Sequence, residues 1–217
     1  MKILIVGDSH VDTTDEYLKN SKTSVCFGDL LAKQLTGMGH DVTIAGVGGS
    51  KVKDWLGDTV SRKGKSVNTA DLPKSPDLLI AVLGSNDMGK GMTAKEVVSV
   101  FPKLVAKYGA KSYMWVGPPR MRTKTAYSNA NMDKLYKAAL AESIPMFDSR
   151  VPTGQMVDAG SGDGVHVGPD AADAWADSVA AAVGSGSARG GGETNPLLIV
   201  GGAVLLAVAL AFARKKK

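Results

Sequence analysis

The first eleven residues, MKILIVGDSHV, constrain the fold more than any other stretch of the chain. A short apolar run over Lys2–Val6 ends abruptly in Gly7, Asp8 and Ser9. An apolar run of that length, bounded by a turn signal, predicts a buried strand of an α/β sheet. Ser9 then lies just past the carboxyl end of the strand, where open α/β sheets bind their ligands. A serine there also commonly caps the next helix, so Ser9 alone does not define a catalytic site.

Further apolar runs alternate with stretches of helical periodicity along the chain. Four more strands are expected, at Asp41–Ala45, Asp77–Leu83, Lys111–Val116 and Ile144–Phe147. Helices are expected at Cys26–Thr36, from Val52, behind a Thr93/Glu96 capping box, at Ser128–Glu142 and at Pro169–Val183. This alternation predicts an α/β fold of the flavodoxin-like, three-layer α/β/α kind, with a five-stranded parallel sheet covered on both faces.

Two details of this pattern can be checked in a structure. In the helix at Ser128–Glu142 we expect Met132, Leu135 and Leu140 to face inward. The polar stretch Ser61–Lys74 has no apolar period, so we expect a surface excursion there.

The C-terminal part of the chain differs from the rest. Leu197–Ala213 has 17 residues without a charge, Pro196 precedes it, and Arg214–Lys217 follow. As a helix it would extend roughly 26 Å, close to the ~30 Å of a hydrocarbon core. We therefore expect a domain at 1–183, a Gly/Ser-rich linker at 184–195, a single transmembrane helix at 196–213 and a basic tail at 214–217.

Composition excludes several classes of function. The formal net charge is +5, but without Arg214–Lys217 the chain carries 22 basic and 21 acidic residues, so nothing indicates a nucleic-acid partner. Cys26 is the only cysteine, which excludes an intrachain disulfide and a cysteine-rich zinc site. We expect a buried thiol there.

The residues suited to acyl transfer gather at the turns that follow the strands. Ser9, Gly49 and Asn86 follow the first three strands, and Asp163 and His166 precede the last helix. A hydroxyl nucleophile needs a base, the base needs an orienting carboxylate, and the oxyanion needs donors. His166 can serve as the base and Asp163 as the carboxylate that orients it. The oxyanion donors can be the backbone amides of Ser9 and Gly49 and the side chain of Asn86.

Each of these residues also has an ordinary structural explanation. Gly49 suits a tight turn, Asn86 suits a helix cap, and Asp163 and His166 suit a loop. Their order along the chain, and their phase relative to the predicted strands, favour a common site.

The motifs resemble those of the SGNH (GDSL-type) hydrolase family across about Met1–Val183. Gly7-Asp8-Ser9 is similar to the first block, Gly46–Ser50 to the second, Gly84–Asp87 to the third, and Asp163–His166 to the closing Asp-x-x-His. Ile44 and Lys51 depart from the family, where asparagine and threonine are frequent. The resemblance implies Ser9 as nucleophile, Gly49 as oxyanion donor, no metal, and hydrolysis of esters, thioesters or carbohydrate acetyl groups. We therefore expect no cofactor.

The other two histidines are rival bases. His10 directly follows Ser9, and a residue adjacent to Ser9 in a tight turn cannot easily fold its ring back onto that hydroxyl. His40 precedes the second strand and therefore lies at the opposite edge of the sheet. His166 is the better candidate.

The sequence thus predicts a membrane-anchored serine hydrolase acting on a small-molecule, lipid or carbohydrate ester. Alternatives are a non-catalytic module that binds a glycan or lipid, and a structural component of a cell or virion membrane. The basic tail favours an outward-facing domain, whereas the start of the chain shows no export signal. We expect a cytoplasm-facing domain, with a viral or internal membrane as another location.

Overall fold

A parallel sheet forms the centre of the computed structural model, which describes residues 1–13, 26–62, 64–122, 126–154, 164–186 and 189–190. Its strand order is β2-β1-β5-β6-β7. These strands are β1 (Lys2–Gly7), β2 (Asp41–Gly46), β5 (Leu78–Val82), β6 (Ser112–Val116) and β7 (Met146–Phe147). The predicted five-stranded parallel sheet is confirmed, and its order is that of flavodoxin-like folds.

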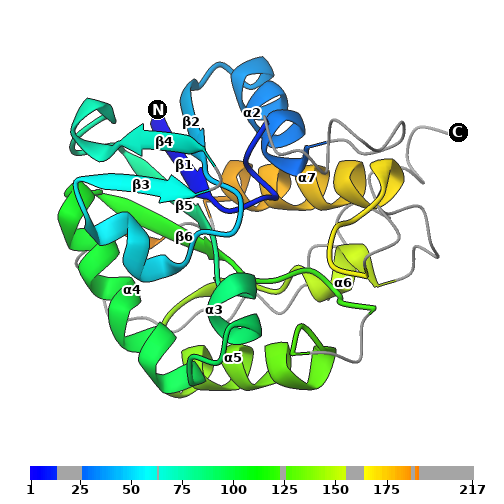
Figure 1. Cartoon of the computed structure of the whole chain (residues 1–217). Helices are drawn as coiled ribbons and strands as arrows, with labels where there is room; N and C mark the ends of the chain where they lie inside the picture. The colour runs from blue at the N-terminus through cyan, green and yellow to red at the C-terminus, as the bar shows by residue number, and fades with distance from the viewer. Residues whose placement is uncertain (14–25, 63, 123–125, 155–163, 187–188, 191–217) are drawn as a thin grey trace, which may run out of the picture.

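Helices cover both faces of the sheet (Figure 1). On β1, Ile3 and Ile5 pack in one apolar cluster, and Leu4 and Val6 pack in another, because successive side chains of a strand point to opposite faces. The first cluster includes residues of α2 (Phe27–Gly37) and α7 (Pro169–Gly184), and the second includes residues of α4 (Ala94–Tyr108) and α5 (Asn129–Ala141). Shorter helical segments are η1 (Val52–Leu56), η2 (Thr69–Asp71), α3 (Ser85–Gly89) and α6 (Arg150–Thr153).

The predicted start of α4 is confirmed in detail. Thr93 Oγ1 accepts a hydrogen bond from the Glu96 backbone amide at 3.3 Å, and Glu96 Oε2 accepts one from the Thr93 amide at 2.7 Å. This reciprocal capping box satisfies two amides that a helix start otherwise leaves without acceptors.

One expected core residue of α5 is on the surface. Leu140 is 54% exposed, whereas Ala139 is fully buried together with Met132 and Leu135. At about 100° per residue, Ala139 lies about 20° around the helix from Met132, whereas Leu140 lies about 80° away. The prediction for Leu140 was therefore wrong, because hydrophobicity was given more weight than helical phase.

The stretch expected to be a surface excursion contains regular structure. β3 (Thr59–Arg62) and β4 (Lys65–Asn68) form an antiparallel pair beside the main sheet. Val60 is 1% exposed and joins the core cluster of α4 and α5, and Val67 packs against the same cluster, so both strands contact the domain. Four-residue strands with one buried position in β3 and none in β4 have too little alternation to be recognised in the sequence.

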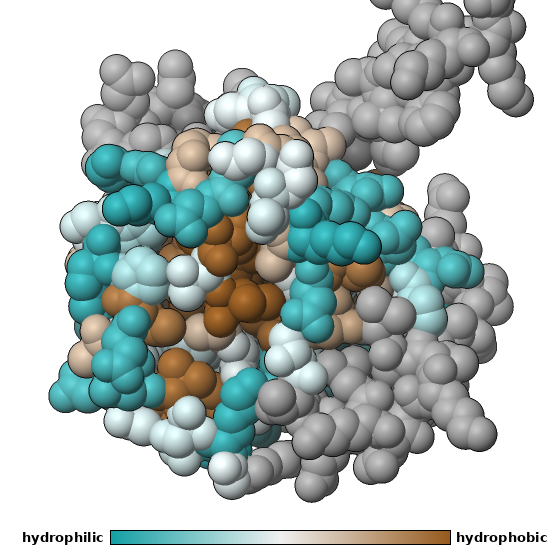
Figure 2. Space-filling model, turned by 90° about the horizontal axis from the view of Figure 1, so that it is seen from above, coloured by the Kyte–Doolittle hydropathy of each residue, from teal (hydrophilic) through white to brown (hydrophobic). Residues whose placement is uncertain are grey.

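The described surface exposes few large hydrophobic side chains. Figure 2 shows hydrophobic residues in the middle of one face, framed by hydrophilic ones. The most exposed large hydrophobic residues described are Met1, Met38 and Leu140.

The chain after α7 returns to the sheet. β8 (Arg189–Gly190) pairs antiparallel with Ser112 and Tyr113 at the start of β6, within the segment expected to be a linker. No helix in the described ranges is long and apolar enough to cross a membrane. The transmembrane helix expected at 196–213 lies outside those ranges.

Candidate active site

The turn after β1 presents Ser9 at the carboxyl edge of the sheet. The Asp8 carbonyl accepts hydrogen bonds from the backbone amides of Val11 (3.0 Å) and Asp12 (2.9 Å), which closes the turn around Ser9. His166 Nε2 lies 2.7 Å from Ser9 Oγ. The fold therefore brings the predicted nucleophile and base into hydrogen-bond contact across 157 positions of sequence.

The loop before α7 positions His166. The Gly164 carbonyl accepts a 2.7 Å hydrogen bond from the Arg122 amide, which ties this loop to the segment after β6. On either side of His166, Val165 packs against one core cluster and Val167 against the other. Asp163, the predicted orienting carboxylate, lies outside the described residues.

The other two histidines occupy different places. The His10 ring lies 5.3 Å from the His166 ring and 5.4 Å from that of Trp175, centroid to centroid, so it packs beside the base rather than replacing it. His40 lies between α2 and β2, at the amino edge of the sheet, where its backbone amide donates to the Leu35 carbonyl.

The glycine-rich turn after β2 is held from two sides. Gly48 donates its backbone amide to Asp12 Oδ2 at 2.8 Å, and Lys65 forms an ion pair with the other oxygen of that carboxylate. Lys90 Nζ donates to the Gly49 carbonyl at 2.8 Å. Gly49 has φ of +78°, a conformation that L side chains rarely adopt. The turn therefore requires glycine there and presents the Gly49 amide in a fixed position.

Lys90, which donates to the Gly49 carbonyl, has a partly buried ammonium group. Burial lowers the pKa of Lys90, and the nearby charges of Arg62 and Lys51 lower it further, against the opposing charges of Asp54 and Asp8.

Asn86 lies in α3, directly after β5, and is 8% exposed. Its Nδ2 donates to Asp8 Oδ2 at 3.1 Å, and its Oδ1 accepts from the Tyr127 hydroxyl at 3.2 Å. Asn86 does not cap a helix, which is the structural role that its sequence context also allows: its side chain contacts Asp8 and Tyr127 in other segments.

Two of the three predicted oxyanion donors are backbone amides. Across the described ranges, neither the Ser9 amide nor the Gly49 amide donates a hydrogen bond. Polar groups near an acyl carbonyl that lack a partner in the free protein remain available for the oxyanion.

Two buried carboxyl groups near the site were not singled out from the sequence. Burial raises the pKa of Asp8 to about 7, against the opposing hydrogen bond from the His10 amide and the charge of His166. Burial raises the pKa of Asp87 to about 6, although the Val52 amide donates to its carboxylate. The available signal for Asp8 was an acidic residue directly after a buried apolar strand, whereas Asp87 lies within α3, five residues after β5.

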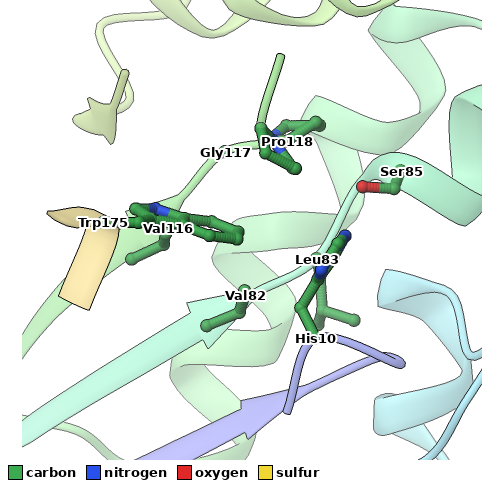
Figure 3. A pocket seen from close by; sticks show the side chains of 9 residues that line it. His10, Val82, Leu83, Ser85, Val116, Gly117, Pro118 and Trp175 are labelled. Atoms are coloured by element: carbon green, nitrogen blue, oxygen red, sulfur yellow. The ribbon is translucent and has the colours of Figure 1, made fainter. Parts of the chain in front are cut away.

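A narrow pocket lies beside these residues, at the ends of β5 and β6. In Figure 3 the Trp175 ring and the Ser85 hydroxyl point into it from opposite sides. Its remaining walls include His10, Val82, Leu83, Val116 and Pro118. Tyr136 donates its hydroxyl to the Pro118 carbonyl at 2.8 Å and so fixes one wall. Among the residues described, no three His, Cys, Asp or Glu side chains are grouped as a metal site would require.

Solved structures share this fold at low sequence identity. A lipase/acylhydrolase from Enterococcus faecalis is 16% identical with a TM-score of 0.60, over 89% of this chain and 100% of that one. A carbohydrate acetylesterase family member from Sinorhizobium meliloti is 19% identical with a TM-score of 0.57, over 84% and 97%. An acetylxylan esterase from Geobacillus stearothermophilus, solved as a catalytic mutant, is 17% identical with a TM-score of 0.56, over 81% and 90%.

Sequence comparison agrees with the structural one. No curated protein sequence matches the chain significantly. The family model described as GDSL-like Lipase/Acylhydrolase matches residues 3–179, nearly all of the predicted domain. The resemblance inferred from the motifs is confirmed, and the chain belongs to the GDSL-like lipase/acylhydrolase family of SGNH-type esterases.

Proposed function

We propose that this chain hydrolyses the ester of a short acyl group, such as an acetyl group, through a Ser9–His166–Asp163 triad. The observation that carries the proposal is the 2.7 Å contact between His166 Nε2 and Ser9 Oγ. A serine hydroxyl is a weak nucleophile, and a base within hydrogen-bond reach is what activates it.

The chemistry follows from that contact. With the proton of the imidazole on Nδ1, Nε2 accepts the Ser9 proton while Oγ attacks the carbonyl carbon of the ester. The imidazolium then protonates the leaving alcohol, and water attacks the acyl-enzyme with the same ring as base. Asp163 is proposed to orient the ring from Nδ1.

The oxyanion is proposed to bind three donors: the amides of Ser9 and Gly49, and Asn86 Nδ2. Both amides lack acceptors among the described residues, and the Gly49 turn is held in place by Asp12 and Lys90. Donors fixed before the reaction stabilise the developing charge without reorganising, which is usually the largest single contribution to catalysis.

The narrow pocket supports the choice of a short acyl group. His10 follows Ser9 and Ser85 precedes Asn86, so the pocket lies directly beside the proposed catalytic residues. Its lining combines apolar side chains with His10 and Ser85, and the space that it encloses is too small for a long acyl chain. Acetylesterases are among the proteins of similar fold, which is consistent with this substrate class.

Turnover of p-nitrophenyl esters with two, four and eight acyl carbons tests the proposal. We expect the highest kcat/KM for the shortest ester, and Ser9→Ala and His166→Ala to lower turnover by several orders of magnitude. A fluorophosphonate probe should label the wild type and not Ser9→Ala. A folded wild type that is neither labelled nor active would favour a binding module instead.

We further propose that 196–213 anchors the domain to a membrane and that the domain faces the cytoplasm. The uncharged run Leu197–Ala213 followed by Arg214–Lys217 supports the anchor. Fractionation should place the full chain in membranes, and protease added to intact cells should leave the domain uncut. Recovery of the full chain in the soluble fraction would refute the anchor, and digestion without lysis would refute the orientation.

A further inference from the structure

Tyr127 lies outside every motif that the sequence singled out, yet it contacts a proposed oxyanion donor. Its hydroxyl donates to Asn86 Oδ1 at 3.2 Å, while Asn86 Nδ2 donates to Asp8 Oδ2 at 3.1 Å. We propose that Tyr127 is a positioning residue that fixes the Asn86 amide in the orientation needed to bind the oxyanion. This inference rests on the proposed function.

The orientation of the amide matters because its two ends have nearly the same shape. Rotating the Asn86 amide by 180° would place Oδ1 where Nδ2 now lies. The site would then present an acceptor to the oxyanion, and the two would repel each other. Asp8, when ionised, only accepts, and Tyr127 donates on the other side. With Asp8 ionised, the two contacts together favour the orientation with Nδ2 towards Asp8.

One N–H of Asn86 remains available in this arrangement. The first hydrogen of Nδ2 is directed to Asp8, and no described residue accepts the second. Tyr127 therefore leaves the amide with a free donor at the edge of the sheet that carries Ser9.

The Tyr127 ring is seated independently of its hydroxyl. A Cβ atom on Gly89 would come within 2.4 Å of the Tyr127 Cε1 and Cζ atoms, so the ring lies directly on the backbone at the end of α3. Asn131 Nδ2 donates to the carbonyls of Met88 (3.0 Å) and Ala126 (2.9 Å), which clamps the residue before Tyr127 to α3. Removing the hydroxyl alone should leave the ring in place.

The first test is Tyr127→Phe with p-nitrophenyl acetate as substrate. Loss of one orienting hydrogen bond should lower kcat about tenfold and change KM less than twofold, because the oxyanion forms only in the transition state. Tyr113→Phe is the matched control, since the Tyr113 ring packs beside Phe101, away from Asn86. An unchanged kcat in Tyr127→Phe would overturn the inference.

A double-mutant cycle separates action through Asn86 from other roles. If Tyr127 acts by orienting the amide, Tyr127→Phe should have little further effect on kcat in an Asn86→Ala background. The same tenfold loss in both backgrounds would show that Tyr127 acts elsewhere, and would overturn the inference.

A pair of glycine variants tests the seat of the ring. Gly89 and Gly37 are the last helical residues of α3 and α2, but a Cβ on Gly37 meets nothing within 4 Å. Gly89→Ala should displace the ring and lower kcat at least as much as Tyr127→Phe, whereas Gly37→Ala should not. Equal kcat values for the two alanine variants would show that the contact between the Tyr127 ring and Gly89 does not position the ring.

The Ser9→Ala variant distinguishes a failure of the proposed esterase function from a failure of the positioning role of Tyr127. Wild-type activity in Ser9→Ala would refute the proposed function itself. An inactive Ser9→Ala, combined with a low kcat in Asn86→Ala and a normal kcat in Tyr127→Phe, would refute only the role of Tyr127.

Discussion

The carboxylate of Asp12 accepts a 2.8 Å hydrogen bond from the backbone amide of Gly48, which joins the turn after β1 to the turn after β2. Asp12 is 3% exposed, and Lys65 of β4 pairs with its other oxygen. Ser9 and Gly49, each one to three residues from this bond, are thereby held at a fixed separation. A proposed oxyanion site with donors on two turns depends on such a connection.

Asp12→Ala should therefore affect both stability and turnover. It leaves the buried Gly48 amide without an acceptor, which costs about 1–3 kcal/mol of the free energy of unfolding. It also frees the Gly49 turn, so we expect kcat for p-nitrophenyl acetate to fall about tenfold or more. Asp173→Ala, at an exposed position on α7, is the control. A stable Asp12→Ala variant with normal kcat would show that the turns keep their separation without this bond.

Asn86→Ala should lower kcat by about 10²–10³, with a smaller change in KM, because it removes one proposed oxyanion donor. Steady-state kinetics on the shortest active ester measures this. A defect confined to KM would instead assign Asn86 to substrate binding.

Asp8 should make stability depend on pH. Its pKa is raised from 3.8 to about 7 in the folded protein, so between these values the folded state binds the proton more tightly than the unfolded state does. Its contribution to stability is fully present below the lower value and is lost as pH rises through about 7. Between about pH 5 and pH 8 the loss is on the order of 3 kcal/mol, at about 1.36 kcal/mol per unit of pKa.

Urea unfolding of the wild type and Asp8→Asn at these two pH values measures that contribution. The free energy of unfolding should fall less between the two values in the variant than in the wild type. An identical fall in both proteins would mean that Asp8 does not titrate in this range in the folded state.

Truncation after Val183 should leave a folded and active domain. The five parallel strands and the packing faces of all the long described helices precede that point, and β8 adds only a two-residue pairing to the start of β6. Esterase activity and the unfolding temperature, compared with those of a chain truncated after Gly190, measure what β8 contributes. An inactive or aggregated shorter fragment would give β8 a larger role than its pairing indicates.

The sequence by itself determined the sheet and the segments that bear the site. Lys2–Gly7 is apolar and ends in a turn signal, and Thr93 and Glu96 stand at capping-box spacing. Both features act over a few residues, so they can be recognised without knowing where distant segments lie. Parallel strands share a carboxyl edge, and this rule predicts that Ser9 and His166 lie together.

Only the tertiary structure decided which side chains support the site. Tyr127 reaches Asn86 because its ring fits over Gly89, and Asp12 reaches Gly48 because β1 and β2 are neighbours. Neither contact has a period or spacing in the sequence. Each depends on the relative placement of segments that are tens of residues apart, and that placement is set by the packing of the whole core.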